Sequence, residues 1–195
     1  GLGDVYKRQD SIKYDVNWEK YDLNSDGLVD RFLILHCTKP QDNGGASSSI
    51  WSHFSWIEEV VELPNDMSIS HYSIASQHSS SDFGTIIHEM YHQLGAADLY
   101  AVDDATVNQA WKGIGKWDIM ASGNQNGNGL WPSLPTGPSI ELMGSKRYTE
   151  VVLEWPTASD CVGPQIQMHG LSEGGQSLKI PIGDTVSYTH LTLPT

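Results

Sequence analysis

The sequence predicts an α+β domain. Three observations carry this prediction: short strand-like apolar runs in the first half of the chain, one strongly periodic helical segment near the middle, and loops rich in glycine and asparagine after it. The chain has 195 residues, which suits one globular domain with a sizeable core.

Three strands are expected before the helix. Asp30–Cys37 is a short apolar run flanked by turn residues, as in a buried strand. Ile50–Trp56 alternates in bulk, which suits an edge strand, and Met67–Ala75 alternates with period two. The intervening segment Lys39–Ser49 is rich in glycine and serine and predicts an exposed loop.

The helix is expected over Ser81–Leu94. Its apolar residues recur at helical spacing, at Phe83, Ile86, Ile87, Met90, Tyr91 and Leu94. Asp82 suits the N-cap, and Gly95 suits the end of the helix. Farther along, a short helix is expected over Ser139–Gly144 and a strand over Val151–Trp155.

Charge and composition exclude several classes of partner. Asp and Glu number 24 against 11 Lys and Arg, a net charge of −13, which disfavours nucleic acid and anionic lipid. No apolar run reaches the roughly 18 residues of a membrane span. Two cysteines, Cys37 and Cys161, are too few for a disulfide scaffold, and whether they pair stays open.

Both ends of the chain are predicted to be foreign to the domain. One DNA sequence, read in its two orientations, encodes both Asp4–Gln9 and Val186–His190, as a transposase-library adapter would. We therefore assign residues 1–9 and 186–195 to adapter and expect the native fragment over 10–185. The alternative is an ordinary first strand and a polar tail. A fragment of this kind shows neither its leader peptide nor its flanking domains.

The predicted helix carries the sequence HEMYH, residues 88–92. Residues four apart share one helix face, so the imidazoles of His88 and His92 can reach one metal ion. Glu89 lies next to them, where it can act as general base on a water that zinc activates. The alternative is that both histidines are ordinary core or surface residues.

The continuation of the motif supplies a third ligand. Gly95 permits a sharp turn, which brings Asp98 back toward the metal, and an aspartate oxygen is a good zinc ligand. Met120, in the segment WDIMASG, follows as the Met-turn of metzincin metallopeptidases does, below the zinc and not bound to it. Considered separately, Asp98 would more often be a cap of the next segment, and Met120 would more often be an ordinary core residue.

Two long segments carry a family resemblance. HEMYHQLGAADLY (88–100) followed by GKWDIMASG (115–123) resembles the immune inhibitor A family of secreted bacterial and archaeal metallopeptidases. The upstream segments WEKYDLNSDGLVDRFLILH (18–36) and SIWSHFSW (49–56) are also similar to that family, so the resemblance covers roughly residues 17–155.

The resemblance implies a metzincin-like zinc metallopeptidase catalytic domain, with a mixed sheet over the zinc-binding helix and a small lower part around the Met-turn. It further implies a secreted zinc-dependent endopeptidase acting on proteins and peptides, made with a propeptide and C-terminal domains. The sequence departs from the family pattern at Tyr91, where glycine is common, and at Ala96–Ala97, where Leu-Pro is common. Ser122 stands where some metzincins have an oxyanion-stabilising tyrosine, so that role is unassigned.

A structural calcium site is predicted upstream of the first strand. Oxygen ligands are expected at alternate positions of one loop, from Asp22, Asn24, Asp26, Leu28 and Asp30. Gly27 permits the tight turn, but Leu33 stands where an EF-hand needs glutamate, so the segment is a calcium loop and not an EF-hand. The alternative is a turn held by its own Asx side chains.

Other functions compete with the peptidase. A catalytically silent, adhesin-like binding module could keep the fold, although such a module has no chemical need for Glu89. Two further alternatives are a zinc hydrolase of a non-peptide bond and an enzyme held latent by a propeptide.

The remaining histidines of the first half lack metal-ligand spacing and are expected to be structural, namely His36, His53, His71 and His78.

Overall fold

The computed structural model describes residues 12–102, 113–150, 165–181 and 188–191. The chain divides into two compact units. The first unit comprises residues 1–94 with 127–130, and the second comprises residues 95–126 with 131–195. Both mix helices and strands, as the α+β prediction requires. The strand expected over Val151–Trp155 lies outside the described residues, as does Cys161.

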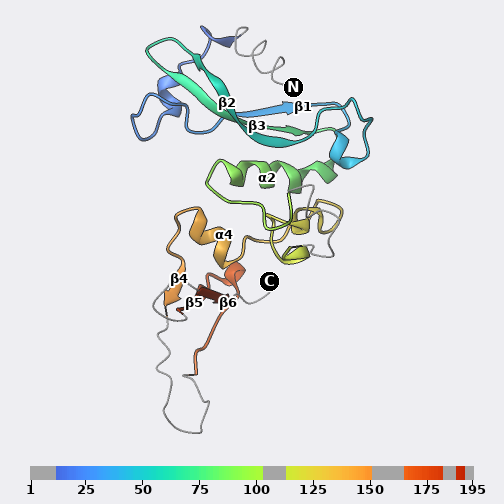
Figure 1. Ribbon diagram of the computed structural model, residues 1–195, viewed down its shortest axis with the longest axis vertical. Coiled ribbons are helices and arrows are strands. Elements are labelled where there is room, and N and C mark those ends of the chain that lie inside the picture. The colour runs from blue at the N-terminus through green and yellow to red at the C-terminus, as the bar shows by residue number, and fades with distance from the viewer. Residues whose placement is uncertain (1–11, 103–112, 151–164, 182–187, 192–195) are drawn as a thin grey trace. The chain divides into compact units, whose positions relative to one another are not determined.

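A three-stranded mixed sheet forms the first unit. Its strands are β1 (Leu33–His36), β2 (His53–Glu62) and β3 (Ser68–Ser76), in the order β1-β3-β2. β1 pairs with β3 in parallel, and β2 pairs with β3 antiparallel, with a register shift between Trp56 and Val61. All three expected strands are present and β2 lies at an edge, as predicted, but β2 begins at His53 and not Ile50, and it continues past the expected end at Trp56 to Glu62. Figure 1 shows helix α2 along one face of this sheet.

The core of the first unit gathers around the central strand. Tyr72 and Ile74 of β3, the central strand of the sheet, are fully buried. Ile69 of β3 belongs to the same buried core cluster, and the cluster is completed by residues outside β3, namely Trp18, Val29, Ile57, Leu63 and Met67. Val29 donates its backbone N–H to the carbonyl of Ser68 at 2.9 Å, which ties the loop before β1 to the start of β3.

Helix α2 spans Phe83–His92, within the range that the periodicity predicted. Its start differs from the prediction, because the carboxylate of Asp82 makes no N-cap hydrogen bond to α2. It instead closes a capping box with Ser79 around the 3-10 turn Ser80–Asp82 that precedes α2. The short polar stretch before the helix thus has a turn of its own, which a single N-cap residue does not predict.

The second unit contains one short helix and a second three-stranded sheet. Helix α4 (Gly137–Leu142) confirms the expected short helix, shifted by two residues. The sheet has the order β4-β5-β6, with strands β4 (Tyr148–Glu150), β5 (Ser177–Pro181) and β6 (Tyr188–Leu191). This sheet was not predicted. β6 lies within residues 186–195, which were predicted to derive from adapter. It pairs antiparallel with β5, and this pairing does not test whether those residues are adapter-derived.

Short 3-10 turns connect these elements. They span Trp18–Tyr21, Gln41–Asn43, Ser80–Asp82, Gly115–Trp117, Ser122–Gln125 and Leu171–Glu173. Among the residues described, no helix is both long and apolar enough to cross a bilayer.

Candidate metal centre

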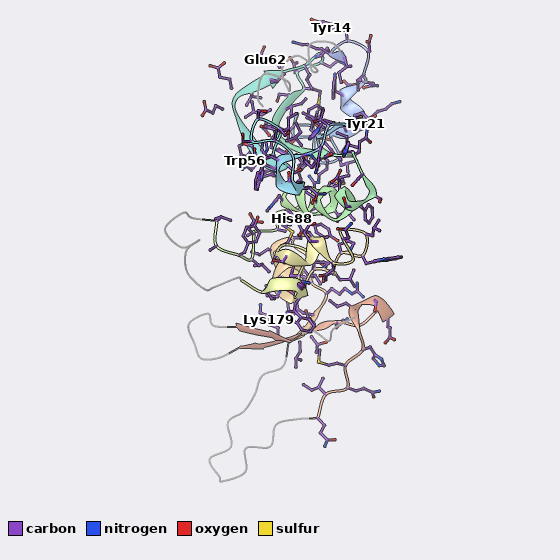
Figure 2. All side chains as sticks on the ribbon, turned by 90° about the vertical axis from the view of Figure 1, so that its right-hand side faces the viewer. Tyr14, Tyr21, Trp56, Glu62, His88 and Lys179 are labelled. Carbon is purple, nitrogen blue, oxygen red and sulfur yellow. The ribbon has the colours of Figure 1, made fainter. Side chains whose placement is uncertain are left out.

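Helix α2 brings the three residues of the HExxH motif together. The ligand atoms of His88, Glu89 and His92 all lie within 4.8 Å of one another. His88 and Glu89 are buried, at 4% and 5% exposure, and His92 is partly buried. Figure 2 marks His88 on this helix. Among the described residues this is the one group of three His, Cys, Asp or Glu side chains with such spacing.

The two imidazoles fit a tetrahedral zinc ion. The Nε2 atoms of His88 and His92 are 3.2 Å apart, and their rings meet edge to face with centroids 4.8 Å apart. Two nitrogens that each lie about 2.0–2.1 Å from a tetrahedral zinc are separated by about 3.3 Å. The observed spacing therefore suits two nitrogen ligands of one ion, and the i, i+4 separation places both rings on one face of the helix.

Aromatic side chains of the sheet line the histidine side of α2. The ring of Phe54, on edge strand β2, lies 6.0 Å from the ring of His92. Phe54 in turn contacts Trp56 and His71 at 5.7 and 5.8 Å. Because Phe54 packs on His92, it limits the rotamers that the His92 ring can adopt.

A buried carboxylate holds the start of α2. Asp82 accepts hydrogen bonds from Ser79 N–H, from the Ser76 hydroxyl at the end of β3, and from the Asn43 amide, at 2.9, 2.9 and 3.1 Å. Burial raises the pKa of Asp82, but these hydrogen bonds outweigh it, so the net shift is downward. Asp82 therefore stays ionised and joins the helix start to the sheet.

Asp98 and Met120 lie in the second unit. Gly95 has a φ of +95°, the left-handed conformation expected where the chain turns after α2. Leu99, next to Asp98, donates its N–H to the carbonyl of Met120 at 2.8 Å, so the two predicted segments are neighbours within this unit. The side chain of Met120 is fully buried.

Met120 sits in a tight turn organised by Asp118. Ala121 N–H bonds the carbonyl of Asp118 at 3.1 Å, which closes the turn. The fully buried Asp118 carboxylate accepts from Met120 N–H and Thr136 N–H at 2.7 Å each, and from the hydroxyls of Thr136 and Ser139. Asp118 lies next to the predicted Met-turn in the sequence, and the sequence alone assigned it no role.

The predicted calcium loop is held by its own Asx side chains. The Asp22 carboxylate accepts from the N–H groups of Asp26 and Gly27, at 3.1 and 2.9 Å. Asp26 accepts from Leu28 N–H at 2.9 Å, and Gly27 has a φ of +81°, which permits the turn. The turn geometry expected from the sequence is present, and the carboxylates face the loop's own backbone.

The four histidines expected to be structural each contact a polar group within the first unit. The hydrogen-bond partner is the Thr38 hydroxyl for His36, the Tyr72 hydroxyl for His53, the Asp30 carbonyl for His71 and the Cys37 carbonyl for His78. Burial lowers the pKa values of His36 and His71, which keeps both rings neutral near pH 7. Cys37 itself is exposed.

Comparison with known proteins places this geometry in a family. Residues 4–137 match the family described as the immune inhibitor A peptidase M6 catalytic domain, which is well over half of the chain. The chain therefore belongs to the immune inhibitor A peptidase family, as its motifs predicted.

Two relatives carry names that describe their activity or family. The chain is 28% identical to a protein named immune inhibitor A from Bacillus thuringiensis subsp. alesti, over 129 residues that cover 59% of this chain and 18% of the relative. It is 26% identical to a pre-pro-metalloprotease, PrtV, of Vibrio cholerae serotype O1, over 133 residues that cover 58% and 14%. The chain thus spans less than a fifth of the length of these relatives.

Proposed function

We propose that this protein is a zinc-dependent endopeptidase that hydrolyses peptide bonds in proteins. The observation that carries the proposal is the 3.2 Å spacing of the His88 and His92 Nε2 atoms, with the buried Glu89 carboxylate beside them. Membership of a peptidase family and a relative named as a metalloprotease support the same reaction.

The residues divide the chemistry between them. His88 and His92 hold the ion, which when bound lowers the pKa of water and polarises a carbonyl oxygen. Glu89 accepts a proton from the attacking water and passes it to the leaving amine, which general acid–base catalysis requires. Its low exposure keeps bulk water away from this proton transfer.

Casein cleavage tests the proposal. Purified protein of residues 10–185 and the full chain are incubated with casein, with and without a zinc chelator. We expect cleavage that the chelator stops and that added zinc restores. If folded, zinc-loaded protein cleaves ester substrates and not casein, the reaction is a different hydrolysis. If it cleaves neither, the proposal fails for this chain, and assay of the full-length gene product before and after limited proteolysis separates a silent binding module from an enzyme held latent by a propeptide.

We further propose that Asp98 is the third zinc ligand and that Met120 forms a metzincin-like Met-turn. The positive φ of Gly95 and the hydrogen bond from Leu99 to Met120 support this, because they give Asp98 and Met120 the local geometry that such a site needs. Three protein ligands would leave one open position for water or substrate.

Replacing Asp98 with alanine is expected to raise the Kd for zinc at least about tenfold, or about 1.4 kcal/mol. The reason is the loss of one oxygen ligand from a set of three. Competition with a chelating dye measures the Kd, and Asp15→Ala, at an exposed aspartate, is the matched control. Unchanged affinity would assign the third ligand to another residue.

We also propose a structural calcium ion in the Asp22–Asp30 loop, where oxygen-bearing side chains alternate around Gly27. Calcium is expected to raise the Tm of the wild-type chain, because the ion binds the folded loop and not the unfolded chain. Differential scanning fluorimetry with and without about 1 mM calcium, a concentration that fills weak extracellular sites, checks this. An equal rise in Asp22→Ala would place the calcium elsewhere.

The protein is proposed to act outside the cell as part of a longer precursor. The Vibrio cholerae relative is named as a pre-pro-metalloprotease, and both relatives are more than five times as long as the matched part of this chain. A propeptide and C-terminal domains are the proposed partners of the catalytic fragment. Expression of the full-length gene, followed by N-terminal sequencing of the protein in the medium, tests export and processing.

A further inference from the structure

The side chain of Gln93 joins the end of α2 to the sheet. Its Oε1 accepts from the backbone N–H of Phe32 at 3.0 Å, and its Nε2 donates to the Phe32 carbonyl at 3.1 Å. Nε2 also donates to the hydroxyl of Ser73, on central strand β3, at 2.7 Å. One amide thus binds both backbone groups of the residue before β1 and one side chain of β3.

Ser73 continues this connection back to the metal motif. Its hydroxyl donates to the backbone carbonyl of Glu89 at 2.6 Å, and its side chain is fully buried. Glu89 is one of the last four residues of α2, whose carbonyls lack partners in an ideal helix. Ser73 therefore satisfies a helix-end carbonyl of the residue that acts on water in the proposed function.

The position of His92 explains why this connection matters. His92 is the last residue of α2, and the last turn of a helix frays most readily. The spacing of the two imidazoles depends on that turn, because a loosened turn would move the His92 ring away from His88. Hydrogen bonds from Gln93 and Ser73 hold the turn at both of its ends.

We infer that Gln93, acting with Ser73, is a positioning residue for the metal site. It holds the last turn of α2 against the sheet, so that His92 and Glu89 keep the geometry in which an ion and a water can be shared with His88. The inference rests on the proposed function, since it concerns the same zinc site. The amide is suited to this role because one group both accepts and donates, which neither a carboxylate nor an ammonium group does.

The variants are chosen to remove hydrogen bonds with little change of volume. Gln93→Met keeps the side-chain length and loses all three bonds, and Ser73→Ala removes the hydroxyl that links Gln93 to Glu89. Gln77→Met is the matched control, because Gln77 is an exposed glutamine of the same unit. Circular dichroism and urea unfolding of the metal-free chains establish the folded fraction of each variant.

Two metal readouts then test the role. Zinc affinity of the full chain is measured by dye competition, and the visible absorption of the cobalt(II)-loaded chain reports ligand geometry. We expect Gln93→Met to weaken zinc binding by about 10- to 100-fold, the range for residues that orient metal ligands, and to change the cobalt spectrum. Ser73→Ala should act in the same direction, and the double variant should fall short of the summed effects, because the two residues form one network.

Two results would overturn parts of the argument separately. If Gln93→Met loses stability but binds zinc within about threefold of the wild type with an unchanged cobalt spectrum, Gln93 is only structural. If the wild type binds zinc but does not cleave casein, and Gln93→Met still weakens zinc binding, the proposed function fails and the positioning role stands.

Discussion

Replacing Glu89 with glutamine is expected to lower kcat/KM for casein cleavage by about 10³-fold, within the range for loss of a general base. Glutamine has nearly the shape of glutamate but takes no proton from water near pH 7. Such a loss corresponds to about 4 kcal/mol of transition-state stabilisation. Zinc content should stay near one ion per chain, because the proposed ligands are His88, His92 and Asp98.

Two measurements make this result specific. Zinc per chain is determined by atomic absorption in the same preparation that is assayed, so that loss of metal is not read as loss of the base. Glu19→Gln, at an exposed glutamate of the first unit, controls for the change of net charge. Activity of Glu89→Gln above about a tenth of the wild-type value would assign the proton transfer to another group.

The metal motif could be predicted from sequence because its geometry is local. Residues 88 and 92 share a helix face whatever the helix packs against, so their imidazoles can approach one another without help from distant residues. The three strands of the first sheet were also predictable, since alternation and apolar runs are local properties of β1, β2 and β3. Family motifs covered the same residues.

The supporting contacts could not be predicted in the same way. Gln93 is hydrogen-bonded to Phe32, which lies 61 positions away in the sequence, and Ser73 is hydrogen-bonded to Glu89, which lies 16 positions away. Both hydrogen bonds therefore depend on how α2 packs on the sheet. Neither residue has a side chain that signals metal chemistry. The second sheet is built from strands of three to five residues, and strands this short show little periodicity.

Asp118 belongs to the motif WDIM (117–120), but its role could not be predicted from the motif because it depends on partners distant in the sequence. Thr136 and Ser139 lie 18 and 21 positions away, at the start of α4 and within it. A fully buried aspartate is otherwise rare, because an unpaired charge in the interior is costly. Four hydrogen bonds from the turn and from the start of α4 compensate for the burial of this carboxylate.

Replacing Asp118 with alanine is therefore expected to lower the free energy of unfolding of the second unit by roughly 3 kcal/mol or more. The variant leaves the N–H groups of Met120 and Thr136 buried without their acceptor, and each such group costs about 1–3 kcal/mol. The serine and threonine hydroxyls can rotate toward other acceptors, so their cost is smaller. Urea unfolding, followed by far-UV circular dichroism, measures the change.

Hydrogen exchange separates this local effect from general destabilisation. The amides of Met120 and Thr136 should lose protection in Asp118→Ala, whereas those of β3 in the first unit should keep theirs. Asp15→Ala, which removes an exposed aspartate, should stay within about 0.5 kcal/mol of the wild type. Unchanged protection at Met120 would mean that the backbone turn holds without Asp118. Loss of that protection together with weaker zinc binding would tie the Asp118 turn to the metal site, as the Met-turn proposal requires.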